Sequence, residues 1–400
     1  MAFTGKRILL GVSGGIAAYK AAELARRLVS SGAKVKVVMT RAAQEFVTPL
    51  TFQALTGEKV AAAMFGPGSE PLEHVALGQQ VAAIVLAPAT ANLIGKMAAG
   101  IGDDLLTTIL LAANKPILVC PAMNCEMWAH PAVQENVARL RARGLTVLPP
   151  EAGELACGAT GYGRLPAVET ILDALGKLIS PQDLAGRRIL VTAGPTHEDL
   201  DPVRFLTNRS SGKQGYALAK AAYCRGAAVC LISGPTQLPA PHGVERVVVR
   251  SAREMLDAVL ARFPQADALL MAAAVGDYHP TSRAEHKMKR GAQELTVHLT
   301  QNPDILKEVA RLKKGQVVVG FAAETRDLEA AARRKLEDKS LDLIVANAVN
   351  RPDSGFAVDT NEVTIIGRSQ LPTRLPLLSK EEVAEKVLDQ VAALLPPMHK

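Results

Sequence analysis

The segment from Ile8 to Leu28 is the part of the sequence that most constrains the fold. It starts with an apolar run of strand length, passes through the glycine loop GVSGG, and continues with the alanine-rich face of a helix. The first N–H groups of a helix have no partner within it, so a glycine loop at this point can cradle a phosphate. The same order returns from Ile189, where residues 210–222 open the next helix. Two such openings in 400 residues predict two domains.

Apolar runs of strand length alternate with helical patterns in both halves of the chain. Strands that are apolar on both faces and separated by helices predict parallel sheets with helices on both sides. The expected fold class is therefore α/β, with two doubly wound, Rossmann-like domains at residues 1–180 and 187–400 and a polar link between them. The expected strands are 8–12, 35–39, 81–87, 117–120 and 145–148, then one from Ile189 and others at 228–232, 244–249, 268–274, 317–320, 343–346 and 362–366, followed by a closing helix at 380–395.

Composition narrows the class of protein. The net charge of +7 is spread over both halves and only 4% of residues are aromatic, which disfavours a nucleic-acid surface and suits small phosphorylated ligands. The apolar runs are too short to span a membrane and no apolar leader opens the chain, so we expect a cytoplasmic protein. Five cysteines without a CxxC pair indicate neither a disulfide framework nor a zinc site, and Cys120 is assigned to core packing.

The first glycine loop predicts a mononucleotide rather than a dinucleotide ligand. It does not read GxGxxG, and no acidic residue closes the second strand where a ribose partner would lie. Thr40 stands there instead, and its hydroxyl group can cap the next helix and bind a phosphate. A plain tight turn is the alternative for this loop taken alone.

Further polar side chains follow the third and fourth strands. Thr90 and Asn92 come after one strand and Asn124 after the next, where doubly wound sheets bind ligands. Helix capping is the alternative role for Thr90 and Asn92. Asn124 offers both a donor and an acceptor to a substrate carboxylate or amide. Cys157 lies among glycines, where a core thiol is not expected.

The second half carries groups suited to a polyphosphate. Asp277 follows a buried strand, where a carboxylate can hold Mg²⁺ against phosphates. Residues 286–290 form a basic run, and Lys335 and Lys339 are spaced to share one helix face. A solvated surface charge is the alternative for each lysine taken singly. The sequence SGK near residue 212 lacks P-loop spacing, so a P-loop is rejected.

The first half resembles the flavin-dependent cysteine decarboxylases that act on phosphopantothenoylcysteine. The motifs that carry the resemblance are SGGIAAYK, APATAN, PAMNCEMW and ACGATGYGRL. The resemblance implies a flavodoxin-like domain in which FMN removes hydride from the carbon bearing sulfur, so that CO₂ can leave. His74 and Asn124 would then act on the substrate, and Cys157 would be the acid. The residues implied for FMN are Ser13, Gly14, Gly15, Thr40, Thr90, Asn92 and Met123.

The second half resembles phosphopantothenate–cysteine ligase, through the motifs AGPT, NRSSGKQG, AAAVGDY, KMKR, NPDIL and GFAAET. The resemblance implies that Asn208 and Arg204 serve phosphopantothenate and its activated form, and that Lys287 takes part in the reaction. The basic motif usually ends in lysine, and Arg290 stands there in this chain. The residues implied for CTP are Ala273, Asp277, Lys287, Pro303, Asp304, Ile305, Leu306, Phe321, Lys335 and Lys339.

Together the two resemblances imply a bifunctional flavoprotein of coenzyme A synthesis. It would join 4'-phosphopantothenate to cysteine through an acyl-cytidylate, with CTP as co-substrate and Mg²⁺ bound at Asp277, and would then decarboxylate the product to 4'-phosphopantetheine. They also imply a homo-oligomer, with trimers of the flavin domain joined through ligase dimers into a dodecamer. The alternatives are a flavin-binding regulatory protein without catalysis and a two-domain NAD-type dehydrogenase.

Overall fold

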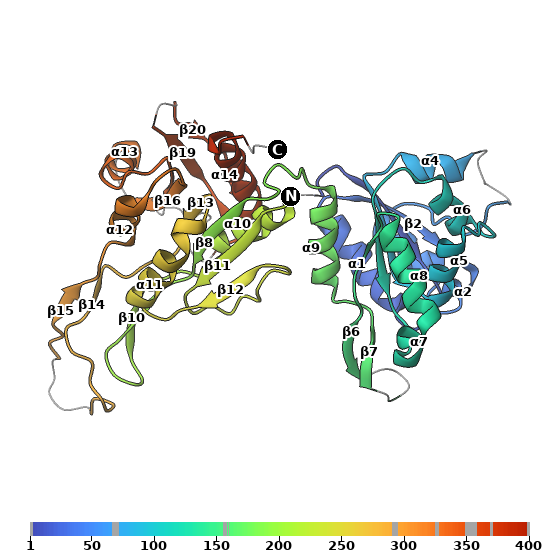
Figure 1. Cartoon of the computed structure of the whole chain (residues 1–400), viewed down its shortest axis with the longest axis horizontal. Helices are drawn as coiled ribbons and strands as arrows, with labels where there is room; N and C mark the ends of the chain where they lie inside the picture. The colour runs from blue at the N-terminus through green and yellow to red at the C-terminus, as the bar shows by residue number, and fades with distance from the viewer. Residues whose placement is uncertain are drawn as a thin grey trace. The chain divides into compact units, whose positions relative to one another are not determined.

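The structure is a computed structural model that describes residues 3–65, 72–154, 158, 160–289, 295–324, 328–348, 358–368 and 371–397. The chain divides into two compact units, Met1–Ser180 and Pro181–Lys400, and each has its own sheet (Figure 1). Among the described residues, no helix combines the length and the apolar character that crossing a membrane requires. The predicted α/β class is confirmed in both units.

The sheet of the first unit is parallel and follows the order β2-β1-β3-β4-β5. This is the flavodoxin-like order, in which the chain reverses its direction of winding between β1 and β3. A ligand is therefore expected at the carboxyl ends of these two strands. The strands are β1 (Arg7–Val12), β2 (Lys34–Met39), β3 (Ala83–Ala89), β4 (Ile117–Pro121) and β5 (Thr146–Val147).

Helices cover both faces of this sheet. Leu10 on β1 packs in one core with α1 and α9, whereas its neighbour Leu9 packs in another with α5, α6 and α8. Successive side chains of a strand point to opposite faces, so β1 is apolar from Ile8 to Val12. Cys120 is fully buried, as predicted, and burial raises the pKa of its thiol. The helices are α1 (Ala18–Ser30), α2 (Arg41–Gln44), α3 (Pro49–Thr56), α4 (Glu73–Gln79), α5 (Ala91–Ala99), α6 (Leu105–Ala112), α7 (Cys125–Ala129), α8 (Pro131–Ala142) and α9 (Val168–Ile179).

The second sheet follows the order β12-β11-β8-β13-β16-β17-β19-β20. Its parallel part, from β12 to β17, has the Rossmann order 3-2-1-4-5-6, so the switch point lies between β8 and β13. The edge strands β19 and β20 are antiparallel. The strands are β8 (Arg188–Ala193), β11 (Ala228–Ser233), β12 (Glu245–Val248), β13 (Ala268–Met271), β16 (Val317–Glu324), β17 (Leu343–Ala348), β19 (Val363–Gly367) and β20 (Thr373–Arg374).

Helices α10 and α14 pack together on one face of the second sheet, and α11, α12 and α13 contribute to the core on the other face (Figure 1). The helices are α10 (Lys213–Cys224), α11 (Ala252–Arg262), α12 (Ile305–Leu312), α13 (Leu328–Asp338) and α14 (Lys380–Leu394), and a 3₁₀ turn, η1, spans Phe263–Gln265.

Short antiparallel pairs lie outside the two main sheets, and no pattern in the sequence predicts them. They contain only a few residues each, too few for an alternating pattern to be read. The pairs are β6 (Glu151–Glu154) with β7 (Thr160–Arg164), β9 (His197–Asp199) with β10 (Phe205–Thr207), β14 (Tyr278–Pro280) with β15 (Leu299–Gln301), and β18 (Thr360–Asn361) with β21 (Leu378–Ser379).

The strand predicted at 268–274 is shorter than expected. It ends at Met271, because the backbone then bonds outside the sheet ladder. The N–H of Ala273 donates to Thr192 Oγ1 at 3.1 Å, and that of Ala274 donates to the carbonyl of Gly194 at 2.9 Å. Residues 272–276 are thereby fixed as a polar backbone segment beside the switch point.

A buried arginine ties the second unit together. Arg225 is 3% exposed and donates to Asp183 before β8 and to Asp389 on α14, the latter at 2.9 Å. Burial lowers the pKa of Arg225, but the adjacent carboxylates outweigh this effect and keep its pKa above the ordinary value. The guanidinium group therefore remains charged within the fold.

We predict that Arg225→Met destabilises the second unit by about 2 kcal/mol, because two carboxylates lose their partner while remaining partly buried. Calorimetric melting of the full chain should show a lower Tm for one transition. Arg253→Met is the control, since Arg253 forms an exposed pair with Asp257 and should change stability by less than about 0.5 kcal/mol. Equal melting curves for both variants would contradict a structural role for Arg225.

Candidate functional sites

A cavity of about 1000 Å³ opens at the carboxyl ends of β1 and β3 in the first unit. This is the switch point at which the topology predicts a ligand. The residues predicted to hold FMN all line it: Ser13, Gly14, Gly15, Thr40, Thr90, Asn92 and Met123, together with Asn124.

Ser13 joins the two loops that form the floor of this cavity. It is 1% exposed, and its Oγ donates to the carbonyl of Pro88 at 2.7 Å and accepts from the N–H of Thr90 at 3.0 Å. The end of β1 is thereby attached to the end of β3. The hydroxyl group of Ser13 thus positions the binding loops in addition to lining the cavity.

Close backbone packing explains one glycine of the loop. A Cβ on Gly14 would lie 2.4 Å from Cβ of Ala42 and 2.6 Å from its carbonyl carbon, so a side chain there would push the loop away from α2. Thr40 caps α2 by accepting from the N–H of Ala43 at 3.2 Å, as predicted. Thr90 caps α5 in the same way, through Leu93 at 3.4 Å. Both hydroxyl groups therefore cap a helix, and both residues also line the cavity.

The start of α1 supplies donors to the cavity. No side chain caps α1, and residues from the loop into its first turn line the cavity. Lys20 and Arg41 also line it, so a phosphate would meet both backbone N–H groups and positive charge. Ile16 and Leu165 add apolar surface suited to an aromatic ring system. The periodicity of the sequence does not predict that these residues line a cavity, because Ile16, Lys20, Arg41 and Leu165 occupy ordinary helix or loop positions.

The loop after β4 lies against the hairpin of β6 and β7. The N–H of Met123 donates to the carbonyl of Gly163 at 3.0 Å, and a Cβ on Gly163 would lie 2.2 Å from the carbonyl oxygen of Met123. Asn124 is half-buried and its Oδ1 accepts from the N–H of Glu126 at 2.8 Å. Cys157 belongs to the connection between β6 and β7 and lies outside the described residues.

His74 is not brought to this cavity. It lies half-buried on α4, and it is absent from the described residues that line the cavity. A role for His74 in the same site would therefore need a second copy of the chain or a movement of α4.

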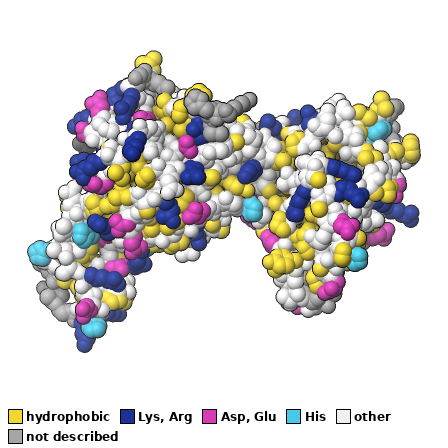
Figure 2. Space-filling view, viewed as in Figure 1, with side chains coloured by type: hydrophobic (Ala, Val, Ile, Leu, Met, Phe, Trp, Pro, Cys, Tyr) yellow, Lys and Arg dark blue, Asp and Glu magenta, His cyan; other side chains and the backbone are white. Residues whose placement is uncertain are grey.

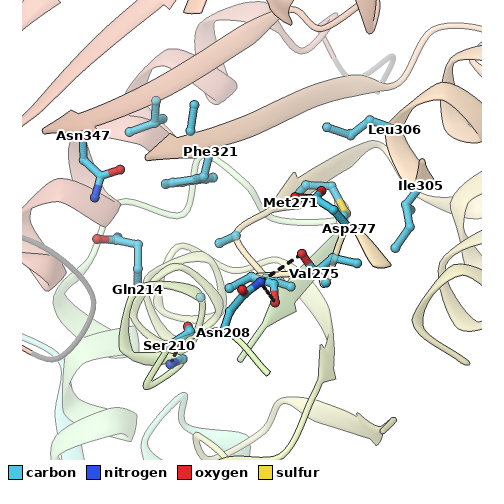
Figure 3. A pocket seen from close by; sticks show the side chains of 18 of the residues that line it. Asn208, Ser210, Gln214, Met271, Val275, Asp277, Ile305, Leu306, Phe321 and Asn347 are labelled. Atoms are coloured by element: carbon cyan, nitrogen blue, oxygen red, sulfur yellow. Dashed lines mark hydrogen bonds between the residues drawn. The ribbon is translucent and has the colours of Figure 1, made fainter. Parts of the chain in front are cut away.

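A second pocket, of about 520 Å³, opens at the carboxyl ends of β8 and β13 in the second unit (Figure 3). It too lies at the topological switch point. Nine of the predicted residues line it: Asn208, Ala273, Asp277, Pro303, Asp304, Ile305, Leu306, Phe321 and Lys339.

Asn208 is fixed by the segment that follows β13. Its Nδ2 donates to the carbonyls of Ala274 and Val275 at 3.1 and 3.0 Å (Figure 3). With both amide hydrogens committed to the backbone, its Oδ1 is the atom left to receive a ligand donor. Asn302 donates to the carbonyl of Gly276 at 2.8 Å and holds the other end of the same segment.

The two lysines predicted near CTP have different positions. Helix α13 ends at Asp338, so Lys339 lies just beyond it, where its Nζ pairs with Asp304 at 3.1 Å and lines the pocket. Lys335 is exposed on α13 and does not line the pocket. The N–H of Lys339 still donates to the carbonyl of Lys335 at 3.2 Å, so one helical turn joins the two residues. The role of Lys335 at the CTP site stays a prediction.

Lys287 and Arg204 do not line the pocket: Lys287 lies on an arm formed by residues 281–289, and Arg204 lies in the β9–β10 loop. Buried Asp201 holds this arm to the β9–β10 loop by accepting from the N–H groups of Arg204 at 2.7 Å and Met288 at 3.2 Å. Arg204 in turn donates to the carbonyl of Met288 at 3.2 Å. Burial raises the pKa of Asp201, but these N–H donors and that of Val203 outweigh it, so its pKa lies below the usual range. Arg290 lies outside the described residues.

Asp277 fits Mg²⁺ only in combination with a ligand phosphate. It is exposed at the pocket wall, and the described residues hold no cluster of three or more side chains of the metal-binding types. Mg²⁺ commonly keeps several waters and is held by one or two carboxylates together with substrate phosphates. Asp277 could supply such a carboxylate.

Several residues that line the second pocket were missed from the sequence. Lys213 and Gln214 stand in the motif SSGKQG, which gave a signal only for the backbone of the helix start. Asn347 lies one residue before the end of β17, where the rule for strand ends would have found it. Asn361 and Lys380 come from β18 and the start of α14, and no local pattern marks them.

Comparison with known proteins agrees with this division into two sites. The Flavoprotein family matches residues 2–180, and the family described as DNA/pantothenate metabolism flavoprotein C-terminal domain matches residues 184–395. The coenzyme A biosynthesis bifunctional protein CoaBC of Vibrio vulnificus strain CMCP6 is 48% identical over 395 residues, which is 98% of each chain. The chain belongs to this family.

Other members of the family are similarly close. CoaBC of Bacillus subtilis strain 168 is 47% identical over 394 residues, 97% of each chain. A crystal structure of the C-terminal domain of a CoaBC protein is 42% identical, with a TM-score of 0.47, and covers 53% of this chain and 97% of its own. The match over residues 2–180 makes the first unit a flavoprotein domain.

We predict that Gly14→Ala lowers flavin affinity by at least about tenfold, since the added Cβ displaces the loop from α2. The measurement is the visible flavin absorbance of the purified chain and its recovery on titration with FMN. Gly95→Ala on α5 is the control, because its Cβ would meet only Asn136 Nδ2 at 3.7 Å and flavin binding should be unchanged. Full flavin occupancy in both variants would show that the loop tolerates a side chain.

Proposed function

We propose that the second unit joins 4'-phosphopantothenate to cysteine with CTP, and that the first unit decarboxylates the product to 4'-phosphopantetheine with FMN. The chain is thus a bifunctional enzyme of coenzyme A biosynthesis, a ligase and a decarboxylase, as its relatives' family name indicates. The observation that carries the proposal is the gathering of the predicted flavin residues around one cavity at the switch point of the first sheet. Incubation with phosphopantothenate, cysteine, Mg²⁺ and either CTP or ATP, while CMP, AMP and CO₂ are followed, tests it.

The ligase step needs a better leaving group than the oxygen of a free carboxylate. The carboxylate of phosphopantothenate would attack the α-phosphorus of CTP and release pyrophosphate, and the cysteine amine would then displace CMP from the acyl-cytidylate. In this reading Asn208 presents its Oδ1 to the substrate, and Lys339 and Lys287 neutralise phosphate charge. Asp277 would hold Mg²⁺ against the triphosphate. Lys287 is exposed on the arm, so its role requires the arm to approach the pocket.

The decarboxylation step takes place in the first cavity. A bound flavin supplies the electron sink that loss of CO₂ from a cysteine carboxylate otherwise lacks. The start of α1, with Lys20 and Arg41, would hold the flavin phosphate, and Ile16 and Leu165 would contact its ring. Asn124 would hold the substrate carboxylate. Cys157 would deliver a proton to the product.

We propose that the first unit forms trimers in which a second copy completes the cavity. Ile16 and Tyr19 line the cavity and are 62% and 60% exposed, although side chains of this kind are usually covered. His74 lies outside the cavity of its own chain and would serve that of a neighbour. Dimers of the second unit would join trimers into a dodecamer, which sedimentation tests.

We further propose a cytoplasmic location. The surface is consistent with this proposal, since charged side chains of both signs are interspersed on the face of each unit seen in Figure 2.

We predict that Cys157→Ser still binds FMN but forms less than about 1% of the aminothiol product, because a serine hydroxyl is a much weaker acid than a thiol. Product is measured by mass spectrometry after supply of phosphopantothenoylcysteine. The control is Cys125→Ser, which should retain both flavin and activity. Normal product formation by Cys157→Ser would remove Cys157 from the mechanism.

We predict that Lys287→Gln lowers CTP-dependent CMP release at least about tenfold and leaves decarboxylation of supplied phosphopantothenoylcysteine intact. The reason is the loss of one positive charge from the triphosphate site of one unit only. Lys307→Gln, an exposed lysine of α12 that does not line the pocket, is the control. Equal loss of both activities in Lys287→Gln would contradict the separation of the two reactions.

A further inference from the structure

The wall of the second pocket includes a basic corner that the preceding roles leave unused. It is formed by Lys213 and Gln214 from the first turn of α10, and by Lys380 from the first turn of α14. These helix starts are far apart in the sequence and are held together by a hydrogen bond from Gln214 Nε2 to the carbonyl of Lys380 at 3.2 Å. Two ammonium groups and the starts of two helices therefore meet at one end of the pocket.

Lys380 is buried to an extent that is unusual for a lysine. It is 6% exposed although it lines a pocket, and burial lowers its pKa to about 8, with the charge of Lys213 acting in the same direction. Asp359 offsets this in part, since its Oδ1 lies 2.5 Å from Lys213 Nζ and its carbonyl accepts from the N–H of Lys380. A buried ammonium group gains stability from any anion that enters the pocket.

The surrounding backbone also favours an anion. Gly212 precedes α10 with φ of 78° and provides no side-chain cap, so N–H groups of the first turn lie at the pocket wall. Gln214 Oε1 is buried and accepts no hydrogen bond within the described part of the chain. Because Gln214 Nε2 donates to Lys380, the amide is oriented so that this oxygen can accept a hydrogen bond from a ligand hydroxyl group.

We propose that Lys213 and Lys380 form a subsite for a phosphate group of an organic phosphate that also carries a hydroxyl group. The subsite deepens the proposed ligase function and rests on it for the identity of the ligand. Two substrates have this chemistry, namely the phosphate monoester of phosphopantothenate and the triphosphate of CTP. Binding there would place the remainder of either molecule along the pocket towards Asn208 and Asp277.

Calorimetric titration of the flavin-loaded full chain with phosphopantothenate, pantothenate and CTP with Mg²⁺ tests this proposal. Lys380→Met is expected to weaken either phosphopantothenate or CTP at least about tenfold, while the affinity for pantothenate, which has no phosphate, stays unchanged. The weakened ligand identifies the phosphate that occupies the subsite. Lys213→Met should weaken the same ligand. The Tm of each variant is measured in the same samples, so that lost binding can be told apart from unfolding.

Lys386→Met is the matched control, since Lys386 is an exposed lysine of the same helix paired with Asp389 and does not line the pocket. Unchanged affinity of Lys380→Met for both phosphate compounds would overturn the subsite, as would a wild-type chain that binds neither. If the wild-type chain binds these compounds and Lys380→Met does not, but no CMP is released from CTP in the complete reaction, the subsite stands and the proposed ligase function fails.

Discussion

Burial of a parallel sheet on both faces is the constraint on which both units depend. Once helices cover the faces, the ends of the strands are the places where the backbone can meet a ligand, and the carboxyl ends lead into helix starts with available N–H groups. In each sheet the winding reverses at a single point, between β1 and β3 or between β8 and β13. Each unit places its cavity there.

The two cavities differ in how their walls are made. The first combines an uncapped helix start with apolar side chains, a setting for a flat ring that carries a phosphate. The second is lined by amide groups, by backbone held through Asn208 and Asn302, and by lysines, a setting for ligands with several charges. The same architecture thus serves redox chemistry in one half and acyl activation in the other, because the side chains at the strand ends differ.

The sequence was sufficient to predict the sheets and most of the polar groups at their edges. Apolar runs such as the one ending at Val12 identify buried parallel strands. Thr40 and Thr90 follow such runs directly, and Asn124 comes shortly after another. Lys213 and Lys380 could not be paired in advance, because their proximity arises from the packing of α10 on α14. Spacing alone could not show that, of Lys335 and Lys339, the described pocket is lined by Lys339, because spacing does not say how α13 is turned towards the sheet. The roles of His74, Lys287 and Arg204 in the two sites stay predictions.

The hydroxyl group of Ser13 couples the positions of two loops in the flavin domain. Its hydrogen bonds to Pro88 and Thr90 connect the loop after β1 to the loop after β3, so a shift of one loop is expected to move the other. A substitution in either loop that changes the affinity for the flavin would therefore also change how the substrate is positioned. New specificities would therefore arise more readily at the edge of the cavity, where residues of the β6–β7 hairpin can change without disturbing these loops.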